Sequence, residues 1–169
     1  KGYLLDEQDP HCLYDLLGIL KADAKFFYID ADEEMLEAEE FIKTAKSFGG
    51  IPAYAYLGDV GESVTGDKKA QKFEDDYLED LFKEIKKAGF EAVAYMPTRN
   101  TAEQLSRVQE LCKKYQMFEI SGEDVNSPRQ KFECVALADP KYSHLIESTW
   151  ALIGHESVVN EKGVEYGMF

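Results

Sequence analysis

The stretch LFKEIKKAGFEAVAYMPTRN (residues 81–100) decides the fold, because it joins the end of one helix to a complete strand. Its first half continues a pattern from about residue 75 in which apolar side chains recur every three or four positions, as in an amphipathic helix. Gly89 is a residue type that often ends helices, and the apolar run EAVAYM (91–96) is typical of a buried strand. A helix followed by a strand is the repeating unit of a parallel sheet.

The same unit recurs on both sides of this stretch. Upstream, IPAYAYL (51–57) reads as a strand. Downstream, a helix over 101–116 leads into a strand over 117–120, and this helix is capped by Asn100 or Thr101, with Glu103 or Gln104 closing a capping box. Further elements are expected at 12–20 (helix), at 25–29 (strand), from Asp30 or Asp32 to Gly49 (helix) and at 141–153 (helix).

This alternation predicts an α/β fold made of parallel β/α units. Four strands are too few to close a standard barrel, so the sheet is either open or part of a barrel. We expect one domain over residues 1–159, followed by a frayed tail over 160–169. An incomplete barrel leaves sheet edges unpaired, which predicts a homodimer or a swapped assembly.

Composition limits the classes of partner. The net charge of −14 argues against a nucleic-acid backbone or an anionic membrane surface as the main partner. The three cysteines are far apart, without a CxxC pair, which suits reduced thiols in a cytoplasmic protein better than a zinc ribbon. No signal peptide or transmembrane run is present in the sequence.

Polar residues follow each predicted strand, and parallel strands bring such residues to one rim of the sheet. Carboxylates and amides on this rim suit a divalent cation, and arginines suit a phosphate or carboxylate. The same residues also serve as helix caps or ordinary loop residues, so both interpretations stay open. The residues concerned are Asp30, Asp32, Asp59, Glu62, Arg99, Asn100, Glu123, Asp124, Asn126 and Arg129.

Two further features bear on a site. The loop ISGEDVNSPRQ (120–130) carries more polar side chains than one turn needs, which favours a functional role. Tyr56 is the last aromatic residue before a Leu-Gly turn, and its side chain either packs on the sheet or points into the site. The three histidines lie away from the strand exits, so we expect structural or exposed positions for them and no histidine-rich zinc centre.

Three segments resemble the C-terminal half of a PHP (polymerase and histidinol phosphatase) domain. These are GGIPAYAYLGDV (49–60), LFKEIKKAGFEAVAYMP (81–97) and TAEQLSRVQELCKKYQMFEISGEDVNS (101–127), and the order and spacing match over residues 38–127. The resemblance implies a distorted (β/α)7 barrel that holds two or three zinc, manganese or iron ions and hydrolyses phosphoesters.

The resemblance also implies roles for single residues. Asp124 stands at the position of an aspartate ligand of the family, whereas Asn126 and Tyr56 stand where the family has histidine ligands. Asp59 is a further candidate ligand, and Arg99 and Arg129 are the candidate catalytic residues that would clamp a phosphorylated or other anionic small molecule.

The opening HxH signature of the family is missing from this chain. Two hypotheses follow. In the first, the chain is the C-terminal portion of a metal-dependent phosphoesterase and is weak or inactive alone. In the second, it is a degenerate PHP-like module that binds a ligand or a partner without hydrolysis.

Overall fold

The computed structural model describes residues 6–61 and 70–169, except for 22–24, 26–29, 31–34 and 126–130. Most of the predicted strand at 25–29, the candidate cap Asp32 and the site residues Asn126 and Arg129 therefore lie outside the described residues. So does Glu62.

The chain divides into two compact units. The first unit comprises residues 1–36 and 125–132 and contains helix α1 (Cys12–Lys21), close to the predicted 12–20. The second comprises residues 37–124 and 133–169 and contains the sheet and all the other helices that the structure describes.

The sheet of the second unit has three parallel strands in the order β1-β2-β3. These are β1 (Ala53–Ala55), β2 (Ala92–Tyr95) and β3 (Phe118–Ser121), with Ala92 opposite both Ala53 and Phe118. The predicted α/β class with parallel β/α units is confirmed. Within the described residues the sheet is open, and nothing in it indicates a closed barrel.

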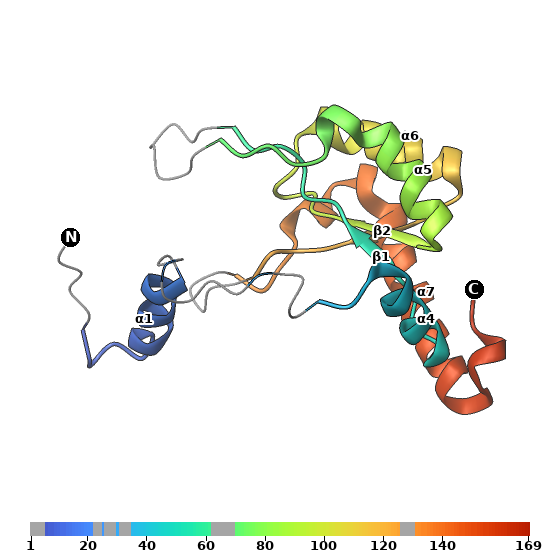
Figure 1. The fold of residues 1–169 in the computed structure, drawn as a ribbon, viewed down its shortest axis with the longest axis horizontal. Coiled ribbons are helices and arrows are strands. Elements are labelled where there is room, and N and C mark those ends of the chain that lie inside the picture. The colour runs from blue at the N-terminus through green and yellow to red at the C-terminus, as the bar shows by residue number, and fades with distance from the viewer. Residues whose placement is uncertain (1–5, 22–24, 26–29, 31–34, 62–69, 126–130) are drawn as a thin grey trace. The chain divides into compact units, whose positions relative to one another are not determined.

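Helices α5 (Leu78–Ala88) and α6 (Ala102–Tyr115) connect successive strands and lie together on one side of the sheet, as Figure 1 shows. The long helix α7 (Ser143–Lys162) is in contact with β3 and runs along the other side. Helix α4 (Ala38–Ser47) leads into β1 and contacts α5. None of the described helices is both long enough and apolar enough to span a bilayer.

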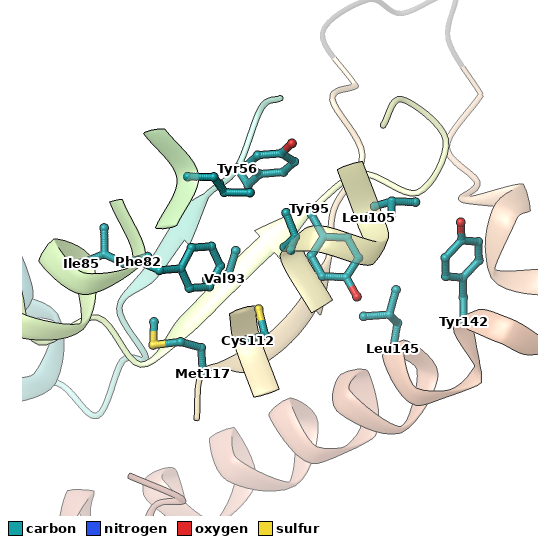
Figure 2. Close-up of a cluster of buried hydrophobic side chains, with 12 residues drawn as sticks. Tyr56, Phe82, Ile85, Val93, Tyr95, Leu105, Cys112, Met117, Tyr142 and Leu145 are labelled. Carbon is teal, nitrogen blue, oxygen red and sulfur yellow. The ribbon is translucent and has the colours of Figure 1, made fainter. Parts of the chain in front are cut away.

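The core lies between the sheet and the α5–α6 layer. Phe82 of α5 and Val108 of α6 are almost completely buried together with Val93 of β2, and Figure 2 shows Phe82 beside Val93. Tyr142 and Leu145, at the start of α7, belong to the same cluster. Burying a large apolar side chain stabilises a fold by about 1.5 to 3 kcal/mol, so this cluster holds the three strands and their helices in place.

Short sequence patterns explain where α5 ends and where α6 begins. Gly89 follows α5 with a φ of 101°, a left-handed conformation that glycine adopts without strain. Thr101 and Gln104 form the predicted capping box at the start of α6, each side chain accepting a hydrogen bond from the other residue's backbone N–H. These short-range patterns were read correctly because they need no distant partner.

Two predicted boundaries were wrong. The helix expected to start at Asp30 or Asp32 begins at Ala38, because Glu37 has an extended backbone and burial starts only with Ile42. The last helix continues nine residues beyond the predicted 153, to Lys162.

The expected frayed tail at 160–169 is also packed in the structure. The Phe169 ring lies 5.8 Å from the Phe118 ring, centroid to centroid, and the Met168 N–H donates a hydrogen bond to His155. Long-range contacts of this kind leave no local signal in the sequence.

Candidate functional site at the strand exits

The exit of β1 is built around two tyrosines and two acids. Tyr54 and Tyr56 alternate along the strand region, and both hydroxyls reach the segment just before α5. Tyr54 donates to Glu74 at 3.1 Å, and Tyr56, which is 1% exposed, donates to Asp75. Burial raises the pKa of both tyrosines, and the neighbouring carboxylates add to the rise. Both hydroxyls are therefore firmly protonated donors at neutral pH.

Glu74 is a buried acid, 4% exposed, that binds backbone rather than a cation. Its carboxylate accepts hydrogen bonds from the backbone N–H of Gly58 at 2.9 Å and of Leu57 at 3.3 Å, as well as from Tyr54. A buried carboxylate is tolerated when several donors replace its hydration. Glu74 thus fixes the turn that follows β1.

Asp75 collects three donors from three parts of the chain. It accepts hydrogen bonds from the Tyr56 hydroxyl, from the Gln104 side-chain amide at 2.6 Å and from the Asp59 backbone N–H at 3.1 Å. Burial by itself raises the pKa of Asp75, but the hydrogen bonds from Tyr56, Gln104 and Asp59 outweigh it and lower the pKa below its ordinary value. The ionised carboxylate therefore links β1 to α6.

Asp59, a predicted metal ligand, joins the segment after β1 to residues 72 and 73, before α5. Its Oδ1 accepts the Phe73 N–H at 2.7 Å and its Oδ2 lies 2.7 Å from the Lys72 ammonium. The hydrogen bond from Lys72, followed by the one from Phe73, lowers the pKa of Asp59. Two backbone hydrogen bonds between Val60 and Gln71, each 2.9 Å long, join the same two segments. Both carboxylate oxygens are thus committed within the protein.

The exits of β2 and β3 bring together one predicted pair. The Arg99 guanidinium lies 4.0 Å from the Asp124 carboxylate and 5.7 Å from the centre of the Phe73 ring. Asp124 is about half exposed and Arg99 about a quarter exposed, so solvent reaches both side chains. Beside them, the Thr98 hydroxyl donates to Glu123 at 2.6 Å.

The described residues do not fit a divalent metal centre. Such a centre needs several convergent oxygen or nitrogen ligands with free lone pairs. Asp59 already binds an ammonium and an amide, the Tyr56 hydroxyl is a donor, and Asp124 faces a guanidinium. In the part of the chain that the structure describes, no group of three His, Cys, Asp or Glu side chains is arranged to hold a metal ion.

Sequence reasoning missed the two acids that organise this rim. Glu74 and Asp75 precede α5 and read as ordinary acidic residues at a helix start. The available signal was the pair of alternating tyrosines in IPAYAYL, because buried hydroxyls need acceptors. Gln104 was expected only as a capping-box residue, and the same side chain also donates to the backbone oxygen of Asp59 at 2.9 Å.

No protein-family model matches this chain, and no similar curated protein or solved structure was found. The resemblance to PHP domains therefore stays a hypothesis.

Proposed function

We propose that this chain is a β/α binding module whose strand-exit rim stabilises the fold and does not hydrolyse phosphoesters. The observation that carries the proposal is the state of Asp59, whose two carboxylate oxygens are bound by Lys72 and by the Phe73 N–H. A divalent cation at Asp59 would lie beside the Lys72 ammonium, which is 2.7 Å from Oδ2 and would repel it.

The buried acids support the same proposal. Catalytic carboxylates need a lone pair or a proton available to a substrate or to a metal. Glu74 and Asp75 instead accept hydrogen bonds from backbone and side chains of β1, its exit and α6. This arrangement supports the second hypothesis drawn from the sequence, a degenerate module that binds a ligand or a partner without hydrolysis.

The phosphoesterase hypothesis remains a second candidate, favoured by the Arg99–Asp124 pair. This pair is exposed to solvent at the exits of β2 and β3, where a PHP-like site would lie. Asn126 and Arg129, two further residues of that hypothesis, follow shortly after Asp124 in the sequence. In that hypothesis Asn126 would be a ligand of a zinc, manganese or iron centre, and Arg129 would clamp the anionic substrate.

Arg99 and the open sheet indicate which partners this chain would bind. Arg99 suits a phosphorylated or other anionic small molecule. The outer edges of β1 and β3 have no strand partner among the described residues, which supports a homodimer formed by edge pairing. A cytoplasmic location is part of the proposal and is supported by the three free cysteines, Cys12, Cys112 and Cys134.

One experiment separates the two functions. Protein purified from cells supplied with zinc, manganese and iron is analysed for bound metal and assayed with p-nitrophenyl phosphate. We expect substoichiometric metal and no turnover, both for the native chain and for Asp124→Ala. The matched control is Asp80→Ala, an exposed acid on α5 that is 78% exposed. Stoichiometric metal and turnover that disappear in Asp124→Ala, but not in Asp80→Ala, would overturn the proposal.

A further inference from the structure

A shallow cavity, largely open to solvent and with a volume of about 570 Å³, lies between α6, β3 and the start of α7. Its lining includes Gln109, Glu110 and Lys113 of α6, Glu119 of β3, and Lys141 and His144 beside the start of α7. Cavities of about 300 to 1,000 Å³ are the size range of small-molecule sites. Charged and polar side chains from three elements thus converge on a space large enough for a ligand.

The hydroxyl of Tyr95 contacts three of the residues that line this cavity, Glu119, Gln109 and His144. Tyr95 is fully buried on the central strand, and its hydroxyl donates to Glu119 Oε2 at 2.7 Å. The Gln109 amide donates to the same hydroxyl at 3.2 Å, and His144 Nε2 lies 3.1 Å away. Burial raises the pKa of Tyr95, so the hydroxyl stays protonated.

The hydroxyl has a single proton, and this proton is given to Glu119. His144 can therefore only donate to Tyr95, which means that Nε2 carries hydrogen. The same nitrogen is 3.5 Å from Glu119 Oε2. In the neutral ring, Nδ1 is then the nitrogen with the free lone pair. The network fixes both the tautomer and the orientation of His144.

Several polar atoms at the cavity can still form a hydrogen bond or an ion pair with a ligand. Among the described residues, Glu119 Oε1, the Gln109 side-chain oxygen, His144 Nδ1 and the Lys113 ammonium have no hydrogen-bond or ion-pair partner. By contrast, Lys141 is 3.0 Å from Asp139 and is partly neutralised. With the exposed carboxylate of Glu110, which also lines the cavity, the unused groups comprise two anions, one cation and two neutral acceptors.

The charge of this lining differs from that of the chain as a whole. The chain carries a net charge of −14, yet two lysines, Lys113 and Lys141, line the same cavity as Glu110 and Glu119. A simple anion would face Glu119, and a simple cation would face the lysines. A ligand with both charges satisfies both sets of groups, because its cationic end then faces Glu119 and its anionic end faces the lysines.

We propose that this cavity binds a small zwitterion, namely a free amino acid. The ligand ammonium donates to Glu119 and to the Gln109 oxygen, and the ligand carboxylate pairs with Lys113. His144 lies beside the bound molecule and reports on it. The inference deepens the proposed binding function, since it names a ligand class and a site for it.

The test uses the complete chain and titrates it with each of the common amino acids up to about 10 mM, which detects dissociation constants in the millimolar range. The ring signals of the three histidines are followed by NMR. We expect at least one amino acid to shift the His144 signals saturably, while His11 and His155 stay unchanged. Its N-acetyl derivative, which lacks the ammonium, and its C-terminal amide, which lacks the carboxylate, should each bind about tenfold more weakly or worse.

Variants locate the site. Glu119→Gln and Lys113→Ala should each weaken binding about tenfold, while Lys43→Ala, an exposed lysine of α4, serves as the matched control. Thermal melting checks folding, and exposed Lys113 still provides the test if the Glu119 variant unfolds. The proposal is overturned if no amino acid shifts the His144 signals in folded protein. It is also overturned if the N-acetyl and amide derivatives bind as tightly as the parent amino acid, or if Lys113→Ala binds the amino acid as tightly as the native chain. Those results would leave the proposed function intact, because that proposal depends on metal content and turnover.

Discussion

The side-chain amide of Asn100 donates a hydrogen bond of 2.7 Å to the backbone oxygen of Leu57, and this bond joins the exit of β2 to the exit of β1. The Asn100 side-chain oxygen accepts the Met96 N–H at 3.0 Å. Both bonds are shielded from water, because Asn100 is only 8% exposed. One side chain therefore satisfies two backbone groups on neighbouring strand exits.

Asn100→Ala should destabilise the fold by about 2 to 3 kcal/mol, because it leaves the Leu57 oxygen and the Met96 N–H without their partner. Chemical denaturation followed by circular dichroism measures the loss. The control is Asn160→Ala, at an exposed position near the end of α7, which should stay within about 0.5 kcal/mol of the native chain. Equal stability of the two variants would show that the bridge between the strand exits contributes nothing.

Gly58 should tolerate no larger residue. Its φ is 72°, and a Cβ atom there would lie 2.8 Å from both the Asn100 amide nitrogen and the Tyr56 hydroxyl, and 2.9 Å from the Gln104 amide nitrogen. We therefore expect Gly58→Ala to cost about 1 to 3 kcal/mol through backbone strain, with a further loss from displaced hydrogen bonds.

The matched control is Gly61→Ala, where a Cβ atom meets no atom within 4 Å and φ is not positive. The two melting temperatures are compared by differential scanning calorimetry. A Gly58→Ala chain that melts together with Gly61→Ala would contradict the close packing of the β1 exit.

The fold class could be read from the sequence because its signals are local. Gly89 ends α5 and the Thr101–Gln104 capping box starts α6, and each signal lies within a few residues of the element that it defines. The alternation of these elements then implies a parallel sheet. Strand lengths were overestimated, since IPAYAYL at 51–57 yields a β1 of three residues, Ala53–Ala55.

The candidate site was harder to predict because its contacts join distant segments. Tyr56 and Asp75 are 19 residues apart, and Asp75 and Gln104 are 29 apart, with a loop and a helix between them. No residue pattern along the chain specifies such pairings. The sequence therefore left open whether the polar residues at the strand exits bind a metal or serve as caps and loop residues, whereas in the described chain they largely bind one another.

The thiols should differ in reactivity. Cys112 is 1% exposed and burial raises its pKa, so iodoacetamide should label it only after unfolding. Burial and then the hydrogen bond with Glu123 raise the pKa of Cys134 to about 11. At pH 8 only about one Cys134 thiol in a thousand is then ionised, and its labelling should accelerate steadily up to pH 11.

Peptide mass spectrometry after timed labelling measures each cysteine separately. Glu123→Gln should speed the labelling of Cys134, because it removes the negative charge that disfavours the thiolate. Glu147→Gln, an exposed acid on α7, is the control and should change nothing. Labelling of Cys134 that is fast at pH 8 and insensitive to Glu123 would refute this account.

Acid should weaken the fold partly through Asp75. Its pKa in the folded protein lies below the ordinary value of 3.8, so its ionised form stabilises the native state. This contribution is complete above the pKa of the unfolded chain and disappears as the pH falls through the lower, folded pKa. Asp75→Asn should therefore cost about 1 to 3 kcal/mol at pH 7, since it weakens charge-assisted hydrogen bonds from Tyr56 and Gln104.

The difference between Asp75→Asn and the native chain should shrink below about pH 4, where protonation removes the same charge from the native protein. Urea unfolding at a series of pH values from 7 to about 3 measures it. Asp76→Asn is the neighbouring control, because Asp76 is 76% exposed and, among the described residues, pairs only with Lys72, so its loss should stay within about 0.5 kcal/mol. Native and Asp75→Asn curves that run parallel over the whole range would mean that the Asp75 carboxylate does not hold β1 to α6.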